Sequence, residues 1–158
     1  MQINFLAILV AAIVPMIVGF VYYHKNVVGT AWMSVTGMTE DKAREGNMAV
    51  IFIVSYILSI MLAFALNSMV IHQNGLLSVF GGDASNELYK QAFEATKDSF
   101  RTFKHGALHG FIAAVFIGLP ILGTNALFEQ KGWKYIWINA GYWAITITIM
   151  GGIICAWR

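Results

Sequence analysis

Residues 104–157 read KHGALHGFIAAVFIGLPILGTNALFEQKGWKYIWINAGYWAITITIMGGIICAW. They contain two uncharged apolar runs, 106–128 and 135–157, joined by the six residues 129–134. Each run exceeds the roughly 20 residues that an α-helix needs to cross a bilayer core of about 30 Å. Because the connection is so short, the two helices must run antiparallel. The sequence therefore predicts a transmembrane helical hairpin.

The composition of the whole chain agrees with a membrane protein. Of the 158 residues, 58% are hydrophobic and 11% are charged, whereas a soluble domain carries roughly 25% charged residues. The net charge of +2 is small and scattered along the chain, so nucleic acid is not expected as a partner. We predict an all-α, polytopic membrane protein with a single domain over residues 1–158.

Four apolar segments define the predicted spans, at about 3–23, 48–71, 106–128 and 135–157. The first is interrupted by Pro15 and lacks the basic start of a cleaved signal peptide, so it is expected to be a retained span. Apolar residues at helical spacing predict one amphipathic helix at about 84–104, lying at the membrane surface. The positive-inside rule does not orient the protein, because five Lys or Arg residues fall on each side.

Small residues recur every four positions within the spans and predict close helix packing. In the second span they are Ser55, Ser59 and Ala63, and in the third they are Gly106, Gly110, Ala114 and Gly118. Helices in lipid gain little by hiding apolar side chains from more hydrocarbon, so a close approach of their backbones must hold them together.

The short turn also predicts a register for the hairpin. Residues whose numbers add to about 264 should lie at one depth, because both helices rise about 1.5 Å per residue. Asn125 is then level with Asn139. Two interpretations remain open: a hydrogen-bonded clamp between the helices, or a polar ligand or ion site to which Asn67 contributes. Glu129 ends the third span, where Lys131 or Lys134 can pair with it.

A second group of residues has the chemistry of a metal site. His105 and His109 are four residues apart and therefore lie on one face of a helix. The same register places His109 level with Cys155, and His72 belongs to the same side of the membrane. This group can bind a metal ion or a haem iron, although no acidic residue and no Cys-x-x-Cys or His-Glu-x-x-His motif accompanies it. The alternative is that Cys155 is a small packing residue.

Motifs of enzymes are missing from the sequence. It has no Gly-rich phosphate loop, no recognisable nucleophile–base pair and no paired carboxylates within a span. We therefore expect no catalytic activity and predict no cofactor.

Several short motifs resemble one family of small bacterial membrane proteins, catalogued as domain of unknown function 1761. The resemblance rests on Asn4-Phe5-Leu6-Ala7, Tyr22-Tyr23, Gly29-x-x-Trp32, Gly37-Met38-Thr39, Leu127-Phe128-Glu129, Ile138-Asn139-Ala140-Gly141-Tyr142-Trp143, Gly151 and Trp157. It covers most of the chain, with residues 72–104 the least typical part. His24-Lys25-Asn26 departs from the family, which often has a proline there. The resemblance implies a four-span protein of the bacterial inner membrane and supplies no activity.

Three functions from different classes follow from these patterns. The leading prediction is a non-catalytic membrane subunit that associates with itself or with another membrane protein, because its apolar faces are wide. The second is an ion or small-molecule conduit that uses Asn67, Asn125 and Asn139. The third is a metal- or haem-binding protein that uses His105 and His109.

Overall fold

A computed structural model describes residues 3–158, and all regular elements within that range are helical. Four segments are long and apolar enough to cross a membrane: Phe5–Tyr22, Met48–Val70, Phe103–Phe128 and Trp133–Ala156. The prediction of an all-α, four-span membrane protein is confirmed. The bounds differ from the predicted ones by at most three residues, and the largest difference is the start of the third span, at Phe103 rather than 106.

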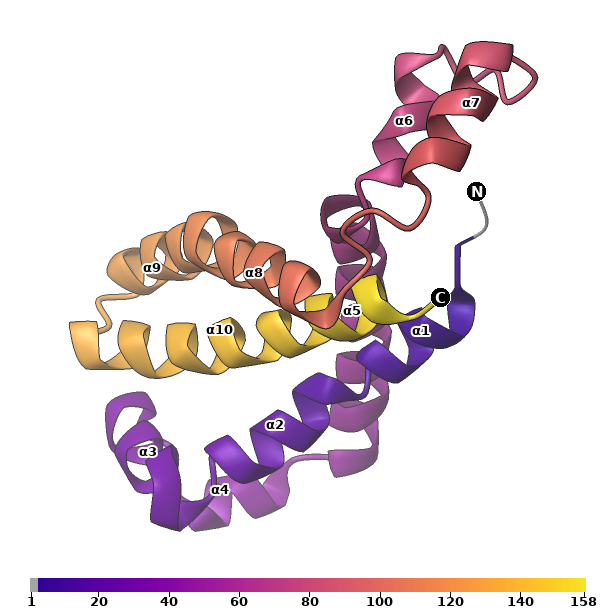
Figure 1. Cartoon of the computed structure of the whole chain (residues 1–158). Helices are drawn as coiled ribbons and strands as arrows, with labels where there is room; N and C mark the ends of the chain where they lie inside the picture. The colour runs from indigo at the N-terminus through magenta and orange to yellow at the C-terminus, as the bar shows by residue number, and fades with distance from the viewer. Residues whose placement is uncertain (1–2) are drawn as a thin grey trace.

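The described chain contains ten α-helices and two π-helical turns (Figure 1). They are α1 (Phe5–Ala11), α2 (Val14–Tyr22), η1 (Lys25–Gly29), α3 (Thr30–Thr36), α4 (Glu40–Glu45), α5 (Met48–Val70), α6 (Gln73–Val79), α7 (Glu87–Thr96), α8 (Phe103–Ala113), η2 (Ala114–Gly118), α9 (Leu119–Phe128) and α10 (Trp133–Ala156). The pair α6–α7 and the C-terminus lie at one end of the molecule. The helices α3 and α4 and the turn between α9 and α10 lie at the other.

Both prolines fall at interruptions of a span, where their missing N–H group breaks the helical ladder. Between α1 and α2, the Ile13 N–H donates to Val10 O at 3.1 Å. Leu9 O instead accepts a hydrogen bond from the Tyr56 hydroxyl of α5 at 3.2 Å. In the third span, Pro120 follows the π-helical turn η2, which absorbs the change in backbone pairing.

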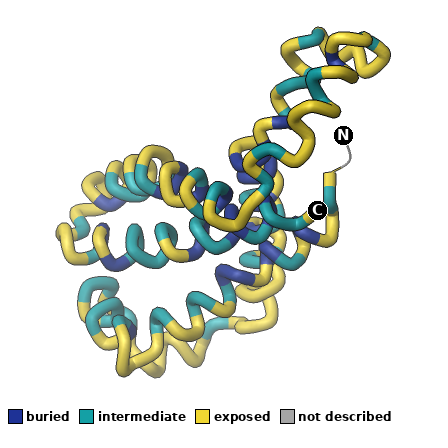
Figure 2. Tube along the Cα trace, viewed as in Figure 1, coloured by how far each residue is buried: buried dark blue, intermediate teal, exposed yellow. Residues whose placement is uncertain are grey.

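The buried core lies where α1, α5, α8 and α10 meet (Figure 2). Its largest fully buried side chains include Ile8, Leu66, Met150 and Ile154. Many large apolar side chains on the outside of the four spans stay exposed. Such an apolar exterior is what hydrocarbon solvates.

Glycines bring α8 and α10 into backbone contact. A Cβ atom on Gly106 would overlap Gly151 O, and one on Gly110 would overlap Ile147 O. Of the other residues predicted to pack, Ala114, Ser59 and Ala63 are buried and Ser55 is half-buried. Gly118 lies in η2 with no atom near its Cβ position, so the prediction that it packs is wrong.

The predicted register of the hairpin is also wrong. Gly106 meets Gly151 and Gly110 meets Ile147, so facing residues have numbers that add to 257 rather than 264. One reason is that α10 begins at Trp133, before the predicted start at Tyr135. The other is that η2 is π-helical and rises less per residue than an α-helix, so the third span contains more residues over the same length.

The amphipathic helix predicted at 84–104 is much shorter in the structure. Helix α7 ends at Thr96, and α8 begins at Phe103, after the Thr102 side chain caps it by accepting the His105 N–H at 3.2 Å. Gln73 of α6 caps the C-terminal end of α7: its Nε2 donates to Thr96 O at 2.6 Å and to Ser99 O at 3.0 Å. The apolar side of α7 packs partly on α6, with Tyr89 buried near Phe80.

The glycine contact gives a matched pair of substitutions within one span. Gly110→Ala forces α8 away from α10, and overpacking of this kind costs about 1–3 kcal/mol. Gly118→Ala adds the same methyl group in open space, so its effect stays within about 1 kcal/mol. Unfolding of the detergent-solubilised protein by denaturant measures both. Equal effects would contradict the packing described here.

Candidate metal centre

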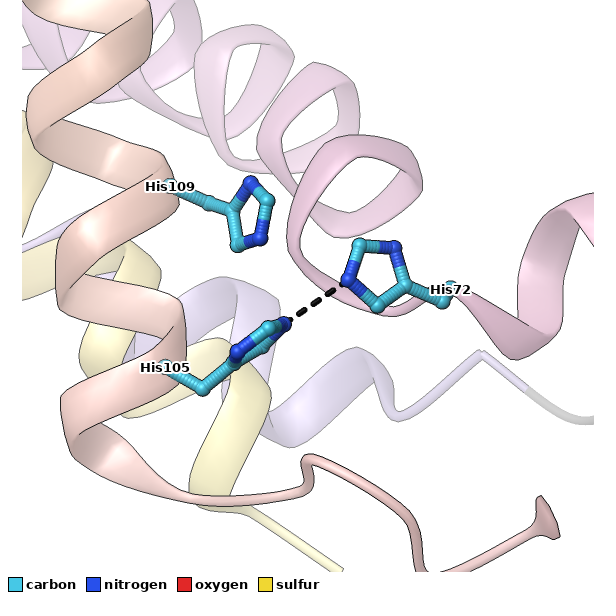
Figure 3. A group of neighbouring side chains, drawn as sticks. All are labelled: His72, His105 and His109. Atoms are coloured by element: carbon cyan, nitrogen blue, oxygen red, sulfur yellow. Dashed lines mark hydrogen bonds between the residues drawn. The ribbon is translucent and has the colours of Figure 1, made fainter.

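Three histidines converge at the end of the bundle that carries α6 and α7 (Figure 3). His72 connects α5 to α6, while His105 and His109 lie one turn apart on α8. The ring centroids are 4.9 Å apart for His72–His105, 4.9 Å for His72–His109 and 4.5 Å for His105–His109. One nitrogen from each ring lies within 4.8 Å of the other two. The structure thus brings together the three histidines that the sequence singled out.

The rotation of α8 follows from its glycines. Gly106 and Gly110 each come directly after one of the histidines, and successive residues point about 100° apart around a helix. Because the glycines face α10, the histidines are turned away from α10 and toward the end of α5. Packing of the hairpin therefore positions two of the three imidazoles.

A direct contact joins two of the rings. His72 Nε2 and His105 Nε2 are 2.8 Å apart, a hydrogen bond in which one nitrogen donates and the other accepts. Two nitrogens bound to one tetrahedral metal ion lie about 3.3 Å apart, given metal–nitrogen distances of about 2.0–2.1 Å. An opening of roughly half an ångström would give these two nitrogens the spacing of ligands on one metal ion. The third nitrogen, within 4.8 Å of the others, would approach by up to about 1.5 Å.

Phe100 covers the site, and nothing in the sequence indicated it. Its ring stacks on His105, with centroids 5.0 Å apart, and meets His72 edge-on at 6.2 Å. Phe100 has a φ angle of 61°, which is rare for a residue with a bulky side chain. A left-handed phenylalanine has no signature in the sequence, so only the structure reveals this contact.

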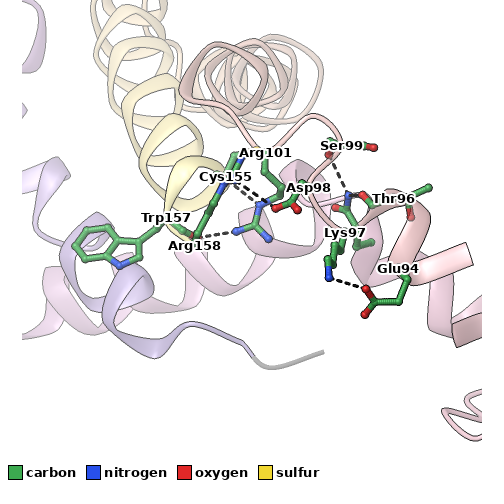
Figure 4. Close-up of polar contacts among 10 residues, drawn as sticks. Glu94, Thr96, Lys97, Asp98, Ser99, Arg101, Cys155, Trp157 and Arg158 are labelled. Carbon is green, nitrogen blue, oxygen red and sulfur yellow. Dashed lines mark hydrogen bonds and ion pairs between the residues drawn. The ribbon is translucent and has the colours of Figure 1, made fainter. Parts of the chain in front are cut away.

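Cys155 does not join the histidines, and the prediction of a Cys ligand is wrong. Its side chain is buried beside Gly106, and its Sγ lies 3.3 Å from both Val70 O and Phe100 O. The shifted register explains this placement, since numbers that add to 257 put Cys155 beside residues 102–106 rather than level with His109. Figure 4 shows the neighbouring Arg101, which donates to Cys155 O at 2.8 Å and to Trp157 O at 2.6 Å.

The clamp predicted between Asn125 and Asn139 does not form. Asn139 Oδ1 accepts a hydrogen bond from the Tyr23 hydroxyl at 3.0 Å, and its Nδ2 donates to Tyr135 O at 2.8 Å. Asn125 instead lines an apolar crevice of about 480 Å³ between α5 and α9. The changed register separates the two amides in depth.

Asn67 and Glu129 do not complete a polar site with these amides. Asn67 is buried in α5, where its carbonyl oxygen accepts a hydrogen bond from Asn74 Nδ2 at 2.8 Å. Glu129 is exposed just after α9, and within residues 3–158 it forms no ion pair with Lys131 or Lys134. The residues proposed for a conduit therefore do not converge.

Comparison with known proteins identifies the family. The family model described as "Protein of unknown function (DUF1761)" matches residues 6–155. The chain belongs to this family. No curated protein and no solved structure matches the chain. Membership in DUF1761 brings no activity with it, so the function must be argued from the geometry of the site.

The two asparagines offer a second matched pair. Asn139→Leu removes the hydrogen bond from Tyr23 and should cost about 0.6–2 kcal/mol of stability. Asn125→Leu should cost nothing, because the Asn125 side chain has no hydrogen-bond partner within residues 3–158 and leucine suits the apolar crevice. Denaturant unfolding in detergent distinguishes the two variants. A larger loss for Asn125→Leu would restore the predicted clamp.

Proposed function

We propose that this DUF1761 protein is a multi-pass membrane protein that binds one divalent transition-metal ion through His72, His105 and His109. The observation that carries the proposal is the convergence of three imidazole nitrogens within 4.8 Å of one another. Three histidines form the ligand set of some zinc sites, in which a fourth position stays open to water or another ligand.

The donor atoms favour some metals over others. Imidazole nitrogen suits zinc, copper, iron and nickel, whereas magnesium and calcium prefer oxygen ligands. Neutral imidazoles leave the full charge of the ion in place, so water, hydroxide or an anion would complete the coordination. His72 is exposed and the other two histidines are half-buried, which gives the ion a route from the aqueous side.

The arrangement also favours a bare ion over haem. Two axial histidines of a haem lie on opposite faces of a porphyrin, with the macrocycle between them. Here the His72 and His105 rings touch directly through their Nε2 atoms, and His105 and His109 project from one face of α8. A porphyrin plane does not fit between any two of these rings.

Self-association and conduction remain predictions that rest on the sequence. The candidate residues of a conduit lie apart, whereas the three histidines lie together, so the geometry supports metal binding better than conduction.

Metal stoichiometry tests the proposal directly. After treatment with a chelator, the detergent-purified protein is titrated with Zn²⁺, and bound metal is measured by elemental analysis. We expect one ion per chain, and loss of that ion in His72→Ala, His105→Ala and His109→Ala. His24→Asn is the matched control, because His24 lies at the opposite end of the molecule. A wild-type protein that retains no zinc would overturn the proposal.

Metal affinity should also depend on pH. Zinc binds the neutral imidazole, whose ordinary pKa is about 6.5, so protons compete with the ion as the pH falls. From pH 7.5 to pH 5.5, the affinity should fall by at least about tenfold. Calorimetric titration measures this loss, with circular dichroism to show that the helices persist. An affinity that is flat across this range would argue against histidine ligands.

A further inference from the structure

We propose that metal bound at the three histidines locks the α6–α7 arm, residues 73–96, in one orientation relative to the helix bundle. This inference rests on the proposed metal binding and assigns that site a regulatory role. It starts from the place of the site in the fold, at the two points where the chain enters and leaves the arm.

The arm is a small helical hairpin that projects beyond the end of α5 (Figure 1) and is largely exposed (Figure 2). Its two helices pack on each other through the buried Tyr89 of α7 and Phe80, the residue after α6, whose ring centroids are 6.0 Å apart. Phe93, also of α7, stacks on Tyr89 at 5.9 Å. Its own contacts therefore hold it together as a unit, while its attachment to the bundle depends on the two connections.

Both connections meet at the histidines. His72 lies on the outgoing connection between α5 and α6, and Phe100 lies on the returning connection between α7 and α8. Phe100 stacks on His105, which belongs to the bundle. An ion held by His72 and by the two histidines of α8 therefore bridges the arm and the bundle at the pivot.

The base of the arm transmits this restraint to both of its helices. Gln73 directly follows His72, and its side chain donates to Thr96 O and Ser99 O at the end of α7. His72 is therefore directly bonded in the chain to the residue that joins the bases of both arm helices. Fixing His72 on α8 therefore restrains the start of α6 and, through Gln73, the end of α7.

Without metal, several polar contacts connect the arm and its two connections to the bundle. One is the ion pair between Arg158 and Asp98 at 3.3 Å, whose side chains are 61% and 67% exposed (Figure 4). Exposed pairs of this kind contribute little to stability. Others are the hydrogen bonds from Asn74 to Asn67 O and between His72 and His105. On the returning connection, Arg101 also donates to Cys155 O and Trp157 O at the end of α10. A ligand that binds only one orientation shifts the population toward it.

Distances measured between spin labels test the lock on the full-length protein. Labels are placed at Ala84→Cys in the arm and Lys134→Cys in the bundle, in a Cys155→Ser background whose hydroxyl can still donate to Val70 O or Phe100 O. A second labelled protein, with Met48→Cys and Lys134→Cys, reports on the bundle alone. Each is measured with and without Zn²⁺, and zinc bound to the same samples is quantified.

We expect a broad distribution between positions 84 and 134 that collapses to one narrow distance when zinc binds. The distribution between positions 48 and 134 should not change. Adding His72→Asn should abolish the narrowing, and adding His24→Asn should preserve it.

Two other results have distinct meanings. Stoichiometric zinc with an unchanged distribution, or a distribution already narrow without zinc, would overturn the lock and leave the metal site standing. Protein that binds no zinc would overturn both the lock and the proposed function.

Discussion

The close contact between the backbones of α8 and α10 is the constraint on which the rest of the structure depends. Gly106, Gly110 and Gly151 let the two helices touch without side chains between them. In a bilayer, where burying more apolar surface gains little, this approach supplies the packing energy. It also fixes the rotation of α8, so the face that carries His105 and His109 is set by the face that carries the glycines.

Tyrosine hydroxyl groups inside the spans donate hydrogen bonds to main-chain carbonyl oxygens of neighbouring helices. Tyr56 donates to Leu9 O beside the break in the first span, Tyr142 donates to Pro15 O, and Tyr22 donates to Ile138 O. Hydrocarbon offers no water to main-chain oxygens, so each hydroxyl provides a partner that the solvent cannot. These bonds join α2 to α10 and α1 to α5. Because these hydroxyl groups already bind main-chain oxygens, they do not line a polar pathway of the kind that a conduit needs.

The three histidines lie at the boundary between this tightly packed bundle and an exposed hairpin. Two ligands come from a helix whose orientation is fixed by packing, and the third comes from the residue that connects α5 to the arm. A bound ion would thus join a part of the fold with many long-range contacts to one with few. That difference is the physical basis of the coupling proposed between metal and arm.

The sequence by itself determined the number of the spans, their limits to within three residues, the order of the loops and the shared face of His105 and His109. These depend on local properties, namely hydrophobic length and helical periodicity. Only the tertiary structure decided that His72 lies beside His105 and His109 and that Cys155 lies apart from them. It also decided that Asn139 accepts a hydrogen bond from Tyr23 and that Gln73 caps the end of α7. Such contacts depend on depth and rotation together, and one residue of shift turns a helix by about 100°. The π-helical turn before Pro120 and the earlier start of α10 changed both depth and rotation, so register across the hairpin had to be observed.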